Sequence, residues 1–166
     1  MKFALVLFLI FTTFISSAQP LPEAMKRLCD SIAEYDCIAR GGMDEDAVQY
    51  RRVDEFCAGL SNQQLGNLVE DKSPVLCCYA FQCLCCRKGA DIFTPLLRHL
   101  GDKRQVALGC NFPPIRKESV SDFILNLISN PLAVSTNREY GYDYKLYTDD
   151  AYFDYKVYQL FLVLPY

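Results

Sequence analysis

The sequence predicts a mainly α fold: a disulfide-stapled helical domain with a small C-terminal β-hairpin, an α+β arrangement. Three observations lead to this prediction. Apolar residues between positions 21 and 128 recur at spacings of three and four, which is the period of one face of a helix. All nine cysteines lie between Cys29 and Cys110. Eight of the eleven tyrosines lie from Tyr140 onward, where aromatic and polar residues alternate as they do in strands.

Residues 1–18 have the composition of a cleaved signal peptide. Lys2 supplies a positive start, residues 3–15 carry no charge, and Ser16 and Ala18 place small residues at the −3 and −1 positions of a cleavage site. This is the order that a signal peptidase substrate needs. The apolar run is shorter than the roughly 20 residues of a membrane-spanning helix. We therefore expect a secreted, extracellular protein with no membrane span.

The remaining chain divides by composition into two parts. Residues 19–131 hold every cysteine and form the expected cysteine-rich helical domain. Residues 132–166 form the expected tyrosine-rich C-terminal β segment, packed on that domain. A chain of 166 residues favours one main domain rather than several.

Capping signals divide the cysteine-rich part into short helices. Ser61 and Gln64 make a capping-box pattern. Prolines stand at several expected helix starts, and glycines stand at several expected ends. The expected helices run from Pro22 to the Gly41-Gly42 pair, from Asp44 to Gly59, from Ser61 through Val69, from Ser73 to Gly89, from Thr94 to Gly101 and from Ser121 to Asn130.

Residues 77–86 contain five cysteines in ten positions, and no charged residue occurs from Pro74 to Cys86. Successive helical residues are rotated by ~100°, so these thiols would point around most of the helix circumference. A helix that is apolar on every side belongs in a core. We therefore expect a buried central helix that disulfides join to its neighbours. The expected partners outside this helix are Cys29, Cys37, Cys57 and Cys110.

Nine cysteines in an exported chain predict an extensive disulfide framework. In an oxidising compartment most cysteines pair, so four bridges would use eight of them, in an order that the sequence does not determine. The ninth thiol is then either buried and free or bridges two chains, which would make a covalent dimer. The disulfide candidates are Cys29, Cys37, Cys57, Cys77, Cys78, Cys83, Cys85, Cys86 and Cys110.

No catalytic motif stands out in the sequence. The adjacent cysteines at 77–78 resemble the active-site helix of secreted phospholipases, but Phe81 stands where that helix carries its histidine. His99 is the chain's single histidine and lies near the end of a short expected helix, where we expect a surface or capping role. The Asp149-Asp150 pair is typical of a solvated turn. We therefore expect no enzyme activity, no catalytic residue, no metal site and no cofactor.

The charge balance excludes one class of partner. With 17 basic and 20 acidic residues, the formal net charge is −3. Nucleic-acid binding depends on an excess of positive charge, so we expect no nucleic-acid partner.

The tyrosine-rich segment is the expected β-hairpin. Tyr142, Tyr144 and Leu146 alternate with Asp143 and Lys145. A turn at residues 148–151 and a second strand over residues 152–164 would complete the hairpin. The tyrosines have two explanations: strand packing alone, or a protein-binding surface, where tyrosine is enriched. The candidate partner surface comprises Tyr142, Tyr144, Tyr147, Tyr152 and Tyr155.

These features favour a secreted, cysteine-rich, non-enzymatic binding protein that acts on an extracellular protein partner. This class includes toxin-like venom components and effectors. One alternative is a secreted carrier of small apolar ligands, because disulfide-laced helical proteins often enclose such pockets. A second alternative is a matrix component cross-linked through the ninth cysteine.

Overall fold

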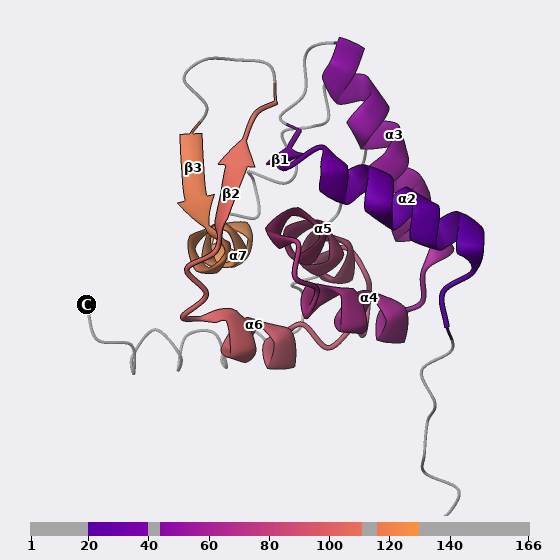
Figure 1. Cartoon of the computed structure of the whole chain (residues 1–166). Coiled ribbons are helices and arrows are strands. Elements are labelled where there is room, and N and C mark those ends of the chain that lie inside the picture. The colour runs from indigo at the N-terminus through magenta and orange to yellow at the C-terminus, as the bar shows by residue number, and fades with distance from the viewer. Residues whose placement is uncertain (1–19, 40–43, 111–115, 130–166) are drawn as a thin grey trace, which may run out of the picture.

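A computed structural model describes residues 20–39, 44–110 and 116–129 of the chain (Figure 1). The helices and strands in these ranges are, in chain order, α2 (Glu23–Glu34), β1 (Cys37–Ile38), α3 (Asp44–Gly59), α4 (Asn62–Val69), α5 (Pro74–Cys85), α6 (Phe93–His99), β2 (Gln105–Leu108), β3 (Arg116–Ser119) and α7 (Val120–Ser129). The prediction of a mainly helical fold with a small β part is therefore confirmed. The expected boundary between residues 131 and 132, and the whole segment beyond it, lie outside the described residues.

Two helix starts follow the capping signals of the sequence. The Ser61 side chain accepts a hydrogen bond from the Gln64 N–H (3.2 Å), and the Gln64 side chain accepts one from the Ser61 N–H (2.9 Å). The capping box at the start of α4 is thus confirmed. Ser73 caps α5 in a similar way, because its Oγ accepts a hydrogen bond from the Leu76 N–H, and Pro74 follows in the first turn.

Several helix boundaries differ from the prediction. The first helix stops at Glu34 rather than before the two glycines, because Asp36 has a φ of 46° and turns the chain into β1. The central helix stops at Cys85 rather than at Gly89. The last helix is capped by Ser119 rather than Ser121, since the Ser119 Oγ accepts a hydrogen bond from the Asp122 N–H at 3.0 Å.

The β part is a three-stranded sheet in the order β1-β2-β3. β1 runs parallel to β2, with Cys37 opposite Ala107. β2 runs antiparallel to β3, with Gln105 opposite Ser119. These strands were not predicted, because β1 has only two residues and β3 is highly polar. The predicted hairpin over residues 142–164 lies outside the described ranges.

The central helix α5 forms the core, as the sequence predicts. Figure 1 shows it in the middle of the molecule, surrounded by α2, α4, α7 and the sheet, and it contacts each of them. Ten of its twelve residues are buried. Because α5 carries no charge, this burial incurs no charge desolvation. Its one tyrosine hydroxyl, that of Tyr79, accepts a hydrogen bond from the Ala39 N–H at 2.8 Å.

No helix in the described ranges is both long enough and apolar enough to cross a bilayer.

Candidate functional site

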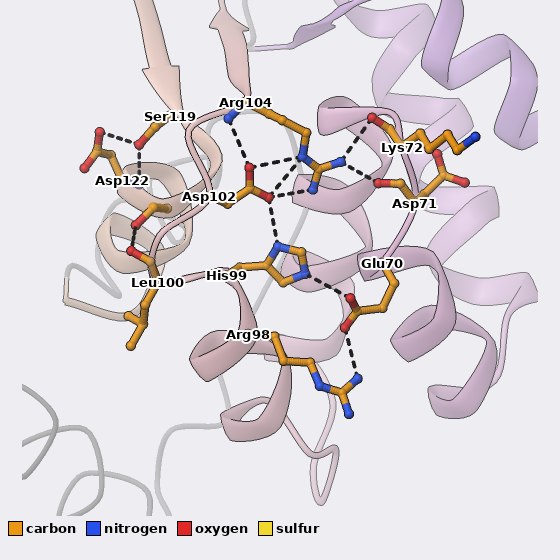
Figure 2. Close-up of polar contacts among 11 residues, drawn as sticks. Glu70, Asp71, Lys72, Arg98, His99, Leu100, Asp102, Arg104, Ser119 and Asp122 are labelled. Carbon is orange, nitrogen blue, oxygen red and sulfur yellow. Dashed lines mark hydrogen bonds and ion pairs between the residues drawn. The ribbon is translucent and has the colours of Figure 1, made fainter.

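A buried polar network lies where α4, α5, α6 and the start of β2 meet (Figure 2). Its centre is His99, the last residue of α6, whose side chain is only 7% exposed. A surface or capping role was expected for this residue, and its burial shows that the surface role is wrong. Figure 2 shows its imidazole between Glu70, at the end of α4, and Asp102, in the loop that leads into β2.

Asp102 holds one side of the imidazole. Its Oδ2 lies 2.9 Å from the His99 Nδ1, and the carboxylate is 11% exposed. The Arg104 Nε and Nη2 donate to the same carboxylate at 3.0 and 2.6 Å. The hydrogen bonds from Arg104, together with the one from His99, hold the pKa of Asp102 well below its usual range although burial opposes this. The carboxylate is therefore an anion that orients both neighbours.

Arg104 extends this network to the turn between α4 and α5. Its Nη1 donates to the carbonyl oxygens of Asp71 (2.6 Å) and Lys72 (3.0 Å). Figure 2 shows the guanidinium lying between these carbonyls and the Asp102 carboxylate. One side chain thus joins the α4–α5 turn to the segment that leads into β2.

Glu70 faces the other side of the imidazole. Its Oε2 is 3.7 Å from the His99 Nε2, which is too long for a hydrogen bond. Its other oxygen accepts a hydrogen bond from the Arg98 Nη1 at 3.1 Å. The His99 Nε2 is buried and makes no hydrogen bond with any residue in the described ranges.

Cys77 of α5 adds a thiol to this network. One potential ligand atom from each of Cys77, His99 and Asp102 lies within 4.8 Å of the others. Burial raises the pKa of the Cys77 thiol to about 12, and the Arg104 guanidinium beside it offsets only part of this effect. The thiol is therefore protonated at neutral pH, and a protonated thiol is a poor nucleophile.

The arrangement of these groups does not match a catalytic triad. In a triad the carboxylate and the nucleophile contact opposite nitrogens of the imidazole, which separates them by roughly 7 Å. Here the Cys77 Sγ and an Asp102 carboxylate oxygen are within 4.8 Å of each other. Cys77 is also fully buried, so a substrate could not reach it without opening of the core.

The same residues are a poor fit to a metal centre, although cysteine, histidine and aspartate are common ligands. A divalent cation bound by these atoms would lie next to the Arg104 guanidinium. That guanidinium already neutralises the Asp102 carboxylate through contacts of 2.6 and 3.0 Å. We interpret the network as a structural ion-pair cluster that fixes α4, α6 and β2 around the central helix.

The cysteine pairing differs from the expected four bridges. Cys37 pairs with Cys110, and Cys57 pairs with Cys83. Cys83 of the central helix thus forms a disulfide with a neighbouring helix, as expected. The Cys37–Cys110 disulfide does not involve the central helix, because it joins the first residue of β1 to the segment that follows β2. Five cysteines carry free thiols instead of one: Cys29, Cys77, Cys78, Cys85 and Cys86.

The free thiols are buried, except that Cys86 is partly exposed. Burial raises the pKa of the Cys29 and Cys86 thiols to about 11, and it also raises the pKa values of the Cys78 and Cys85 thiols. Cys29, Cys77, Cys78 and Cys85 belong to the buried hydrophobic cluster. The core thus uses them as small apolar side chains.

A polar recess of about 550 Å³ opens to solvent between β3 and α7. Arg116 and Glu118 form an ion pair at 2.7 Å in its wall, and the Ser119 Oγ donates to the Asp122 Oδ2 at 2.6 Å. The recess is lined by Gln105, Arg116, Lys117, Glu118, Ser119, Asp122, Leu125 and Asn126. These groups suit polar or backbone contacts rather than an apolar ligand.

Of the candidate site residues predicted from the sequence, the cysteines lie within the described residues and the tyrosines do not. The cysteines are placed as described above, and two pairs form bridges. The tyrosines of the candidate partner surface lie outside the described residues, as does the Asp149-Asp150 pair. The polar network around His99 was not predicted from the sequence. One signal could have indicated it: His99 and Asp102 are three residues apart at the end of an expected helix, so their side chains can meet.

The chain was also compared with protein-family models, with curated proteins and with solved structures, and none of these comparisons finds a match.

Proposed function

We propose that this chain is an exported, disulfide-stabilised protein that acts without catalysis, by binding an extracellular macromolecule in the manner of toxin-like proteins or effectors. One observation carries the proposal. Within the described residues, the thiol and the imidazole that come together, those of Cys77 and His99, are buried in contacts with Asp102 and Arg104, whereas the recess open to solvent is lined by polar groups suited to recognition.

Two intramolecular disulfides support the exported location. They join residues 73 and 26 positions apart in the sequence. Stable disulfides are characteristic of oxidising compartments. This agrees with the signal-peptide pattern of residues 1–18.

The recess favours a macromolecular partner over a small apolar ligand. A carrier of apolar ligands needs a cavity lined mainly by apolar side chains. Leu125 is the one large apolar residue in the lining of this recess, which also contains Arg116, Lys117, Glu118 and Asp122. Such a surface is similar to the polar parts of protein–protein interfaces.

Export is tested by expressing the full chain with residues 1–18 in a secreting eukaryotic host. We expect the protein in the medium, with Gln19 as its first residue by intact mass and peptide mapping. The matched variant changes Phe8→Asp and Leu9→Asp, which places charges in the apolar run and should retain the protein inside the cell. Recovery of both proteins only from the cell interior would contradict the proposed location.

Binding is tested with the exported protein, labelled at its N-terminus and titrated onto intact cells and cell-derived matrix. We expect saturable binding that unlabelled protein competes away. Changing Tyr142, Tyr144 and Tyr147 together to serine should weaken binding about 10-fold or more, because interface tyrosines are frequent hot spots. Phenylalanine at the same three positions should retain most of the binding.

A matched surface control is Leu97→Ser on α6, a leucine that is 45% exposed and outside the recess lining. It should bind like the parent protein. Non-saturable binding, or equal binding by the serine variant, would rule out the proposed tyrosine surface.

A further inference from the structure

A disulfide and a free thiol lie one helical turn apart at the end of the central helix. Cys83 of α5 is bonded to Cys57 of α3, and Cys86, the residue that caps α5, keeps a free thiol. Cys83 and Cys86 make a Cys-x-x-Cys pair, a spacing found in proteins that exchange thiols and disulfides. The Cys57–Cys83 bond and the Cys86 thiol are therefore candidates for exchange with each other.

The backbone at the end of α5 holds Cys86 beside Cys83. The Cys86 N–H donates to the carbonyl oxygens of Gln82 and Cys83, both at 3.2 Å, so the last turn continues through this residue. Cα atoms three residues apart in a helix are separated by roughly 5 Å, and disulfides join Cα atoms that are about 4.4–6.8 Å apart. The Cα spacing of Cys83 and Cys86 therefore suits a disulfide.

The direction of its side chain distinguishes Cys86 from the other free thiols of this segment. Viewed along the helix axis, Cys86 is rotated from Cys83 by ~60°, whereas the other three free thiols are rotated by ~120° or more. Those three, Cys77, Cys78 and Cys85, are buried, while Cys86 is partly exposed. Cys86 is thus the free thiol of this segment that lies on the same face as Cys83.

Arg87 places a positive charge beside this pair. Its Nη2 donates to the Cys57 carbonyl oxygen, and its Nη1 donates to the Asn62 Oδ1 at 2.9 Å. Burial raises the pKa of the Cys86 thiol to about 11, and the Arg87 charge acts in the opposite direction. The guanidinium thus lies near both Cys57 and Cys86, whose sulfurs carry the negative charge after and before an exchange.

We propose that Cys57, Cys83 and Cys86 form an internal thiol–disulfide exchange site, in which the bridge of Cys83 passes from Cys57 to Cys86. The Cys86 thiolate attacks the Cys83 Sγ. The Cys83–Cys86 bond forms as the Cys57–Cys83 bond breaks, and Cys57 leaves as a thiolate that takes up the proton lost by Cys86. The numbers of disulfides and thiols stay the same, so the step needs no external oxidant or reductant.

The exchange changes how α3 is attached to the rest of the protein. In the Cys57–Cys83 form a covalent bond joins α3 to the central helix. In the Cys83–Cys86 form noncovalent contacts, including those with α2 and α5, hold α3 in place. The exchange also frees a thiol at position 57, which is partly exposed. This covalent switch goes beyond the proposed binding function and does not depend on it.

Alkylation of the native full chain with iodoacetamide at pH 8.5 captures both forms. The label goes to Cys86 in molecules with the Cys57–Cys83 bridge, and to Cys57 in molecules with the Cys83–Cys86 bridge. N-ethylmaleimide in denaturant then blocks the remaining thiols. Trypsin gives one peptide of residues 53–72, which contains Cys57, and one of residues 73–87, which contains Cys83 and Cys86. We expect iodoacetamide label in both peptides, in proportions that do not change with protein concentration.

Two matched variants identify the attacking thiol. Cys86→Ala removes it and should lower the labelling of Cys57 about 10-fold or more, because exchange requires a thiolate. Cys85→Ala removes the neighbouring buried thiol and should leave the labelling of Cys57 nearly unchanged. Absence of label at Cys57 in the unmodified chain, or equal labelling in the Cys86→Ala variant, would overturn the proposal. Labelling that rises with protein concentration would overturn it too, because exchange between two molecules would then release Cys57.

A third variant, Cys57→Ser, asks whether the fold accepts the alternative bridge. After oxidation with glutathione disulfide, we expect the Cys83–Cys86 bond beside Cys37–Cys110, with the far-UV circular dichroism of the unmodified protein. Free thiols at both Cys83 and Cys86 in the folded variant would contradict the proposed pairing. If this variant does not fold, the labelling of Cys57 in the unmodified chain decides.

Discussion

At the residue scale, the Asp102 carboxylate is the group on which the buried polar network depends. It accepts hydrogen bonds from Arg104 and contacts His99. Because its pKa is held well below the usual range, the folded state binds its proton less readily than the unfolded state does. The carboxylate therefore stabilises the fold above the ordinary aspartate pKa of about 4, and this contribution declines as the pH falls below that value.

Replacing Asp102 with asparagine should lower the free energy of unfolding by about 2 kcal/mol at pH 7, because Arg104 loses its charged partner while it is only partly open to solvent. The difference between the parent and the variant should shrink at pH 3. Denaturant unfolding followed by circular dichroism at both pH values measures this. Asp30→Asn, at an exposed position on α2, should change stability by less than about 0.5 kcal/mol. Equal stability of Asp102→Asn and the parent at pH 7 would contradict the structural role of the network.

At the element scale, two glycines have different roles. Gly66 lies within α4, and a Cβ at this position would meet nothing within 4 Å. Gly89 lies in the turn after α5 with a φ of 74°, a conformation that side chains other than glycine rarely adopt. Glycine thus weakens one helix and permits one turn.

Gly66→Ala should raise the free energy of unfolding by about 0.5–1 kcal/mol, because alanine restricts the unfolded chain and favours the helix. Gly89→Ala, the matched control, should destabilise by about 1 kcal/mol, since it forces an alanine into the left-handed region. Thermal unfolding of the three proteins measures both effects. A destabilising Gly66→Ala would show that α4 has less space around this position than the structure shows.

The capping box of α4 leads to a second prediction at this scale. Ser61→Ala removes the acceptor for the Gln64 N–H and should cost about 1 kcal/mol of stability. Ser61→Asp, which retains an acceptor, should stay within about 0.5 kcal/mol of the parent. Denaturant titration distinguishes the two, and a Ser61→Ala variant as stable as the parent would indicate that the cap is not formed.

At the scale of the whole molecule, cysteine has two structural roles, since some cysteines form disulfides and others keep free thiols. The bridges Cys37–Cys110 and Cys57–Cys83 join elements that are distant in sequence. Loops of these lengths correspond to about 3.5–4.5 kcal/mol in the chain-entropy account. The free thiols lie in the core around α5 or, for Cys86, at its partly exposed margin, and burial raises their pKa values.

Alkylation with iodoacetamide at pH 7.5 should therefore label the native protein slowly, and Cys86 first, because it is the one partly exposed free thiol. In denaturant without reductant we expect five labelled cysteines, in agreement with the free thiols of the structure. Peptide mapping under non-reducing conditions then identifies the two bridges. Recovery of four bridges, or of a covalent dimer, would contradict this pairing and restore the pattern expected from the cysteine count.

The local features were accessible from the sequence because their causes are local. Ser61 and Gln64 are three residues apart, so the pattern itself indicates their contact. The stretch from Pro74 to Cys86 has no charge, and this alone indicates a buried helix. By contrast, β1 and β3 have little strand character of their own and form only because β2 lies between them.

The sequence by itself determined the composition of the core helix, most of the helix starts and the cysteine richness of the domain. Only the tertiary structure decided which cysteines pair and that His99 is buried beside Asp102 and Cys77. The physical reason is one of distance along the chain. Helix caps and apolar faces depend on residues within a few positions, whereas a disulfide or a buried ion pair depends on where separate elements meet. The Cys37–Cys110 bridge forms because β1 and β2 run side by side, and no count of cysteines contains that information.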